Sequence, residues 1–194
     1  MEIKQLKSKE KIITFFGEVK SCSVESAIKD IAKINLDDLE YVDQCEKWAI
    51  ENNMPPMPVV LNPISLYLST SGGSCYDGLA LYDTIAASNT PIEIYCSGKI
   101  MSIGIIVILA AEVRKAYRNT TFMIHQVGGV SFGKLRDLED SVEEAHRINE
   151  MLFKIIKNKT KITEQQLEDV LNYKKDWFIT AEEALELGII TEIL

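Results

Sequence analysis

The sequence predicts an α/β fold, because strand-like and helix-like segments alternate along the chain. Short apolar runs with strand character lie at Lys11–Phe16, Leu66–Thr70 and Pro91–Cys96, and each is followed by a segment whose apolar residues have helical spacing. Such alternation favours a parallel sheet. The strands also end in small or polar residues, which is the edge where an open α/β sheet places its chemistry.

Composition limits the classes of protein to consider. The 194 residues are 46% hydrophobic and 26% charged, which is typical of one soluble globular domain. The net charge of −8 argues against nucleic acid or anionic lipid as a partner. The four cysteines form no C-x-x-C pair and there are only two histidines, so we do not expect a zinc site. Unpaired thiols without a signal peptide indicate a reducing cytoplasm.

The first third of the chain predicts one strand and two helices. The strand Lys11–Phe16 ends at Gly17. Ser23 can cap a first helix, and Asp37-Asp38 can open a second. The segment Glu51–Pro58 contains three prolines, which cannot continue a helix, so we expect a loop there.

The middle third carries the sharpest pattern. The strand Leu66–Thr70 runs into Ser71-Gly72-Gly73-Ser74, and a helix follows. After Pro91–Cys96, the run Ile103–Ala111 is strongly apolar but too short for the roughly 20 residues of a membrane span, so it predicts a buried helix beginning near Ser102. A further strand, Thr121–His125, precedes Gln126 and the pair Gly128-Gly129.

The last third is helical. From Lys134 to Lys157, apolar residues recur in steps of three and four and predict a helix of about six turns with a narrow apolar stripe. Such a helix either projects to meet a partner or packs on its own core. Two capping boxes follow, at Thr163 with Gln166 and Thr180 with Glu183, before a closing strand at Ile189–Leu194.

Three residues are candidates for catalysis. Ser102 lies at a strand-to-helix junction, where backbone N–H groups stabilise developing negative charge; it is either a nucleophile or a simple helix cap. His125 ends a strand among glycines and is a candidate general base, although a structural role is common for such a histidine. Asp176 is either a solvated carboxylate or one that orients an imidazole.

Together these pieces resemble the Clp protease proteolytic subunit family, the self-compartmentalising serine peptidases of bacteria and organelles. The resemblance covers Ile12 to Leu194, and it rests on an ordered series of motifs. The series is FFGEV at 15–19, SGGS at 71–74 with GLALYDTI at 78–85, G-x-x-x-S-x-G at 98–104, MIHQ-x-GG at 123–129, and D-x-F-x-T-AEEA-x-x-x-G at 176–188.

The resemblance implies a role for each matching residue. Ser102 matches the nucleophile, His125 the general base and Asp176 the orienting carboxylate. The backbone N–H groups of Gly73 and Ile103 match the oxyanion hole. Gly72, Gly128 and Gly129 match the backbone that pairs with the substrate.

It also implies an architecture: a crotonase-like spiral of β-β-α units that forms one domain, residues 1–194. The head is residues 1–127 and 160–194, and the projecting handle is about 128–159. The family forms heptameric rings, stacked in pairs as a tetradecamer, that hydrolyse polypeptides without a metal or organic cofactor. An ATP-driven unfoldase usually feeds the rings, and the handle interlocks them.

The sequence departs from the family pattern in several places, as a divergent member would. Ser71 replaces a proline, and Ile100-Met101 replace small residues that precede the nucleophile, so we expect them to crowd the pocket rim. Lys174-Lys175 replace an acidic residue and an arginine that act between rings. The segment before Ile12 is shorter than the family's axial loop, which leaves unfoldase docking open, and residues 40–63 look like an insertion.

Three functions follow from these observations. The matching triad favours an active serine endopeptidase, while the departures favour a non-hydrolytic subunit that builds or regulates a mixed ring. The third is a relative on the same scaffold: a phage capsid-maturation protease, a signal-peptide-peptidase-like protease or an acyl-CoA enzyme. The acyl-CoA reaction would not require Ser102.

Overall fold

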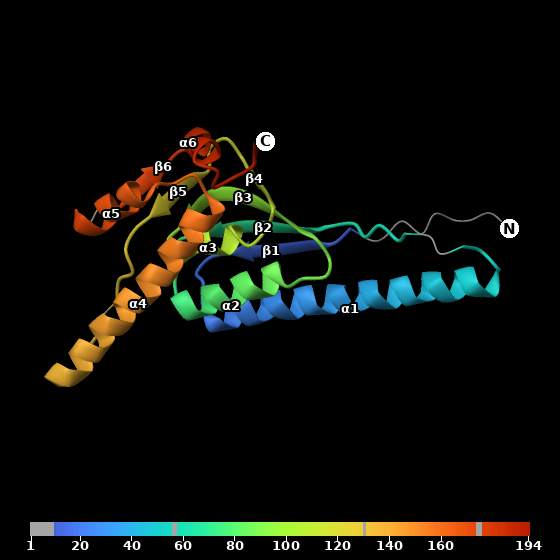
Figure 1. Ribbon diagram of the computed structural model, residues 1–194, viewed down its shortest axis with the longest axis horizontal. Helices are drawn as coiled ribbons and strands as arrows, with labels where there is room; N and C mark the ends of the chain where they lie inside the picture. The colour runs from blue at the N-terminus through green and yellow to red at the C-terminus, as the bar shows by residue number, and fades with distance from the viewer. Residues whose placement is uncertain (1–9, 56–57, 130, 174–175) are drawn as a thin grey trace.

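The computed structural model describes residues 10–55, 58–129, 131–173 and 176–194, and within them one seven-stranded sheet organises the chain (Figure 1). Five strands pair in parallel in the order β1 (Ile12–Phe16), β2 (Ile64–Thr70), β3 (Ile92–Met101), β4 (Val113–Ala116) and β7 (Glu192–Ile193). The far end of β3 also pairs in parallel with β5 (Thr121–Ile124). β6 (Trp177–Ile179) then pairs with β5 antiparallel. The predicted α/β class is confirmed.

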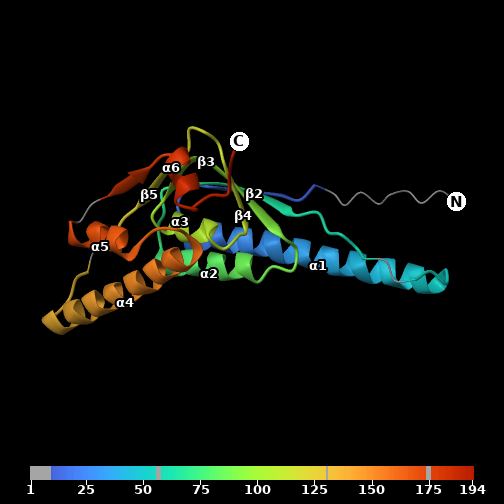
Figure 2. The same ribbon diagram turned by 45° about the horizontal axis from the view of Figure 1, so that its top comes forward.

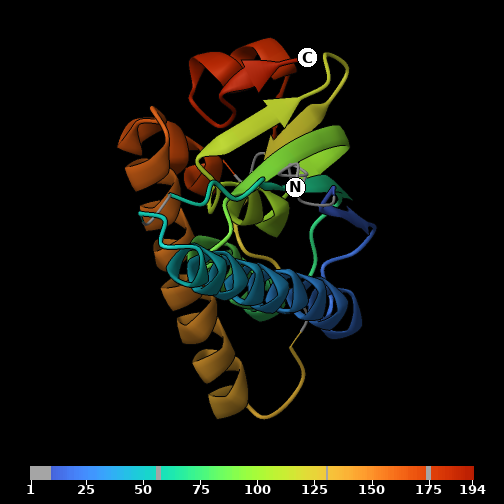
Figure 3. The ribbon, with the colours of Figure 1, turned by 90° about the vertical axis from the view of Figure 1, so that its right-hand side faces the viewer.

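Two helices cover one face of the sheet. α1 (Ser21–Glu51) and α2 (Cys75–Ala86) lie side by side below it in Figures 1 and 3, and α1 continues well past the sheet. The short α3 (Ile103–Ile108) follows β3, and all six of its residues are buried. Alternate residues of β2 are buried, so one face of the sheet packs on these helices. The predicted buried helix is thereby confirmed.

The C-terminal third supplies three helices, α4 (Leu135–Lys159), α5 (Glu164–Asn172) and α6 (Ala181–Glu186). α4 begins far from the body and returns to it (Figure 2). All of α4 is described, and its four buried residues, Ile148, Asn149, Leu152 and Ile156, lie in its second half. Both predicted capping boxes are present, at Thr163 and Thr180. No helix in the described ranges combines the length and the apolar character that crossing a bilayer requires.

β3 changes its partner at Ser97-Gly98. Its first half pairs with β4 up to Cys96, and its second half pairs with β5 from Lys99 onward. The register against β2 shifts there, since Leu68 faces Cys96 whereas Thr70 faces Ile100. Gly98 has φ 64°, a conformation that glycine adopts without steric cost. The bend carries β3 as far as Met101, so the prediction that this strand ends at Cys96 was too short.

The prediction of two helices before the proline-rich segment was wrong. Ser21–Glu51 is one helix of 31 residues, and its cap is Lys20 rather than Ser23. The Ser23 hydroxyl instead accepts a hydrogen bond from the Lys20 N–H at 3.2 Å, as the third residue of the helix. Asp38, expected to begin a helix, lies within it and is buried against Lys11. A buried salt bridge thus accounts for the acidic residue in mid-helix.

Other boundaries differ from the prediction. β4 and β6 were not predicted. The closing strand is only Glu192–Ile193 rather than Ile189–Leu194, and Ile189 and Ile190 are buried core residues that precede it. The segment before residue 10, the pair Pro56-Met57 and the pair Lys174-Lys175 lie outside the described residues. The division into head and handle, and the insertion at 40–63, remain predictions.

Candidate active site

Strand register brings together the three candidate side chains. β3 and β5 run parallel with Met101 opposite Met123, and the Ser102 N–H donates to the Met123 carbonyl at 2.8 Å. Ser102 and His125 therefore leave the sheet at the same edge. β6 runs antiparallel to β5 with Trp177 opposite Ile124, so Asp176 enters at this edge too. Three separate strand ends thus converge.

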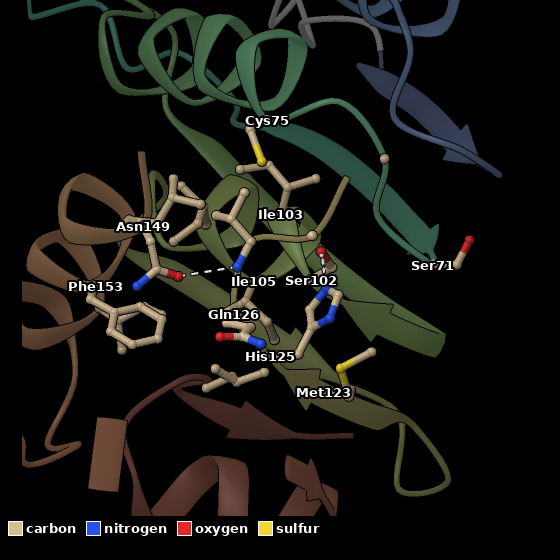
Figure 4. A pocket seen from close by; sticks show the side chains of 17 residues that line it. Ser71, Cys75, Ser102, Ile103, Ile105, Met123, His125, Gln126, Asn149 and Phe153 are labelled. Carbon is tan, nitrogen blue, oxygen red and sulfur yellow. Dashed lines mark hydrogen bonds between the residues drawn. The ribbon is translucent and has the colours of Figure 1, made fainter. Parts of the chain in front are cut away.

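Ser102 contacts His125 directly. Its Oγ lies 2.7 Å from His125 Nε2, well within hydrogen-bond range (Figure 4). Ser102 occupies the cap position of α3, but its side chain makes no capping hydrogen bond. Its backbone has φ 57° and ψ −128°, a strained conformation for a residue with a side chain. The turn directs the hydroxyl toward the imidazole, so Ser102 is not a simple helix cap.

Asp176 lies on the other side of the imidazole but makes no hydrogen bond to it. Its Oδ1 lies 3.8 Å from His125 Nδ1, beyond the length of a hydrogen bond. The Asp176 side chain is 58% exposed and that of His125 is 33% exposed. The structure therefore brings Ser102 and His125 into contact and leaves Asp176 one small movement away.

Glycines allow the chain to pass close to Ser102. A Cβ on Gly72 would lie 2.6 Å from the Ser102 Cβ, and one on Gly73 would lie 2.2 Å from the Val19 carbonyl oxygen. Gly73 is held by bonds on either side of it, from the Val19 N–H to the Gly72 carbonyl and from the Ser74 N–H to the Val19 carbonyl. Within the described residues, the N–H groups of Gly73 and Ile103 have no hydrogen-bond partner. These two donors are available at the same cavity as Ser102.

A cavity of about 240 Å³ opens beside Ser102 and His125. The part of its wall that comes from α3 and the second half of α4 is apolar apart from Asn149, with Ile105, Ile106, Leu152, Phe153 and Ile156 among its residues, whereas Ser71, His125 and Gln126 add polar side chains. Cys75 also lines it, and burial raises the pKa of that thiol, which keeps it protonated. The volume is below the roughly 300–1,000 Å³ of drug-sized ligand sites and suits a single side chain.

The glycines predicted to bind substrate lie in different places. Both Gly128 and Gly129 are exposed, and of the two only Gly128 lines the cavity. Gly72 lies beneath Ser102. The expectation that Ile100 and Met101 crowd the pocket was wrong: Ile100 is fully buried in the core, and neither residue lines the cavity. Within the described ranges, no group of three His, Cys, Asp or Glu side chains is placed to hold a metal ion.

Sequence reasoning missed Asn149. This α4 residue lines the cavity, and its Oδ1 accepts a hydrogen bond from the Val127 N–H at 3.1 Å (Figure 4). The signal was in the sequence, because Asn149 lies four residues after Ala145 and three before Leu152 in the apolar stripe. A polar residue within such a stripe indicates a buried hydrogen bond.

Comparison with known proteins gives concordant results. The family model for Clp protease matches residues 60–194. The ATP-dependent Clp protease proteolytic subunit of Deinococcus radiodurans is 32% identical over 133 residues, which are 68% of this chain and 64% of that relative's length. The solved structure of a ClpP1 mutant from Listeria monocytogenes matches 95% of this chain and 91% of its own with a TM-score of 0.75 at 22% identity, so the two share a fold.

Proposed function

This chain belongs to the Clp protease family, and from that membership and the geometry of the cavity we propose that it is a serine endopeptidase. The substrates are peptides or unfolded polypeptides. The observation that carries the proposal is the 2.7 Å contact between Ser102 Oγ and His125 Nε2, formed at a strained turn beside a cavity of side-chain size. A hydroxyl needs such a base to act as a nucleophile near neutral pH.

The reaction is acyl transfer. Ser102 Oγ attacks the peptide carbonyl carbon while His125 Nε2 takes the hydroxyl proton, and the ring then carries a proton on both nitrogens. Asp176 stabilises that imidazolium once its carboxylate closes the 3.8 Å gap to Nδ1. His125 gives the proton to the leaving amine as the C–N bond breaks. Water, deprotonated by the same nitrogen, then releases the acyl group from Ser102.

The tetrahedral intermediate requires donors for its oxyanion. The N–H groups of Gly73 and Ile103 lack partners within the described part of the chain, and both residues line the cavity. Ile103 is the first residue of α3, so its N–H lies at the positive end of that helix. Loss of one such donor typically lowers the rate about 10²–10³-fold.

The proposed enzyme works as an oligomer of stacked heptameric rings. The first half of α4 supports this arrangement, because Leu135 is 73% exposed and Val142 is 57% exposed. Exposed apolar side chains on a helix that projects from the rest of the chain favour burial of that helix against another subunit. The relative named above is called ATP-dependent, and an ATP-driven unfoldase is the corresponding proposed partner here.

A second candidate function is a non-hydrolytic subunit of a mixed ring. It is favoured by one observation: Asp176 is more than half exposed and makes no hydrogen bond to His125. A triad fixed in this open form would lack the group that orients the base.

Labelling with a fluorophosphonate, followed by intact mass measurement, separates the two functions. We expect a single adduct on the wild-type chain and none on Ser102→Ala, which should fold normally yet hydrolyse no peptide. Ser141→Ala, an exposed serine on α4, is the control and should label like the wild type. Absence of an adduct on a folded wild-type oligomer would favour the non-hydrolytic subunit.

A further inference from the structure

Asn149 is a costly residue at its position. It lies in the middle of α4, where asparagine is a poor helix former, and its side chain is only 8% exposed. The other three buried residues of this fully described helix, Ile148, Leu152 and Ile156, are apolar. A buried amide is tolerated when its polar atoms are satisfied, and each one that is not costs free energy.

Among the described residues, only one end of this amide has a hydrogen-bond partner. The Val127 backbone N–H can only donate, so the atom facing it at 3.1 Å must be the carbonyl oxygen Oδ1. This fixes the orientation of the amide and leaves Nδ2 on the opposite side, toward Phe153 (Figure 4). Nδ2 makes no hydrogen bond to any described residue. Two N–H donors therefore remain unused at the cavity wall.

The other α3 and α4 side chains that line the cavity are apolar. Ile105, Leu152 and Ile156 are apolar, and Cys75 is a protonated thiol whose pKa is raised by burial. Ser102 and His125 line the same cavity, so we assign a side chain that occupies it to the residue whose carbonyl Ser102 attacks. An apolar side chain that fills the cavity displaces water from Nδ2 and leaves both donors unpaired.

We propose that Asn149 determines specificity for the residue that precedes the scissile bond, selecting an unbranched side chain whose tip accepts a hydrogen bond. Among the uncharged standard residues these are methionine and glutamine, in preference to leucine; the charge of glutamate disfavours its burial in this cavity. The long apolar stem packs against α3 and α4, and the terminal oxygen or sulfur accepts from Nδ2. This inference rests on the proposed peptidase function for its position in the reaction.

Peptides that differ only at this residue test the inference. Norleucine, methionine and methionine sulfoxide have similar length, but the first has no acceptor and the last has a strong one without a donor. We expect kcat/KM for methionine sulfoxide to exceed that for norleucine by about 10-fold, the size of one hydrogen bond that would otherwise be lost, with methionine between them. Equal values, or a preference for norleucine, would overturn the inference.

Two variants distinguish the effect of the Nδ2 hydrogen bond on substrate preference from the effect of cavity size. Asn149→Leu removes Nδ2 and should reverse the order, so that norleucine is cleaved faster than methionine sulfoxide. Phe153→Leu enlarges the same cavity without changing the donor. It should change the preferred size of the substrate side chain, while the ratio of kcat/KM for methionine sulfoxide to that for norleucine stays within about twofold of wild type. If the folded Asn149→Leu enzyme still cleaves the methionine sulfoxide peptide faster than the norleucine peptide, Asn149 does not determine this selectivity.

Binding to Ser102→Ala tests the same point without hydrolysis. Fluorescence polarisation of the labelled peptides should rank them in the same order, methionine sulfoxide above norleucine. If wild-type protein neither hydrolyses them nor takes a fluorophosphonate, the peptidase proposal fails, while this ranking still decides the role of Asn149. Equal affinities for the two peptides would overturn that role even in an active enzyme.

Discussion

Two of the acid–base pairs of this molecule lie in opposite surroundings, one buried and the other partly exposed to solvent. Lys11 Nζ lies 2.7 Å from Asp38 Oδ2, and both side chains are only 8% exposed. His125 Nδ1 lies 3.8 Å from Asp176 Oδ1, and their side chains are 33% and 58% exposed. The first pair joins the start of β1 to the middle of α1, whereas the second joins the ends of β5 and β6.

The neighbours of the two carboxylates explain the difference. Asp38 also accepts from the Thr90 hydroxyl, and Lys11 Nζ donates to the Asn62 carbonyl at 2.9 Å, so four parts of the chain fix this pair. Among the described residues, Asp176 has no hydrogen-bond or ion-pair partner other than the imidazole that it approaches. The charges of Lys11 and Asp38 stay the same, so a rigid arrangement stabilises the fold. Asp176 instead has to approach the imidazolium that forms on His125 during turnover, which requires that its side chain can move.

Replacing Asp176 by asparagine gives the largest expected effect. The amide is isosteric but cannot stabilise the imidazolium, so kcat should fall by about 10⁴-fold, as expected for a triad that closes during catalysis. The free energy of unfolding should barely change, because the side chain is mostly exposed. Peptide hydrolysis and urea unfolding measure the two. A loss of tenfold or less would mean that the pair stays open in the working enzyme.

Replacing Asp38 should produce the converse result. Asp38→Ala leaves the Lys11 charge buried without its partner, which should lower the free energy of unfolding by about 3–5 kcal/mol. Activity per folded molecule should be unchanged. Asp43→Ala breaks the exposed pair with Lys47 on the same helix, and should cost only about 0.3–0.5 kcal/mol. Urea unfolding at one fixed protein concentration compares them, and similar losses in both variants would contradict the comparison.

The two pairs also differ in how far the sequence could predict them. Ser102, His125 and Asp176 were identified because each stands in a motif, although β6 beside Asp176 was not predicted and β3 runs on to Met101 rather than ending at Cys96. The Lys11–Asp38 pair joins residues 27 apart, and Asp37-Asp38 instead suggested the start of a helix. Charge alone does not reveal a partner elsewhere in the fold. Asn149 was missed for the same reason, because its role depends on Val127 in another segment.

A third pair, on the surface, tests whether exposure alone makes a contact weak. The Glu144 carboxylate accepts from Arg147 Nε at 2.7 Å and from Nη2 at 2.6 Å, and the Tyr76 hydroxyl also donates to it. These bonds, first those from Arg147, lower the Glu144 pKa from 4.5 to about 2. Because Tyr76 lies on α2, the cluster joins α2 to α4.

The sign of the pH dependence follows from that lowered pKa. A carboxyl group whose pKa is lower in the folded chain stabilises the fold above its unfolded pKa of 4.5, and this stabilisation is lost as the pH falls toward 2. Glu144→Gln should therefore melt at a lower temperature than wild type at pH 6, and the difference should shrink at pH 3. The shift should be the smallest of those predicted here, since water screens the pair. Thermal unfolding at both pH values measures it, and a difference that is equal at the two would show that the charge of Glu144 contributes nothing. In that case burial, rather than the number of hydrogen bonds, would be what makes the Lys11–Asp38 pair strong.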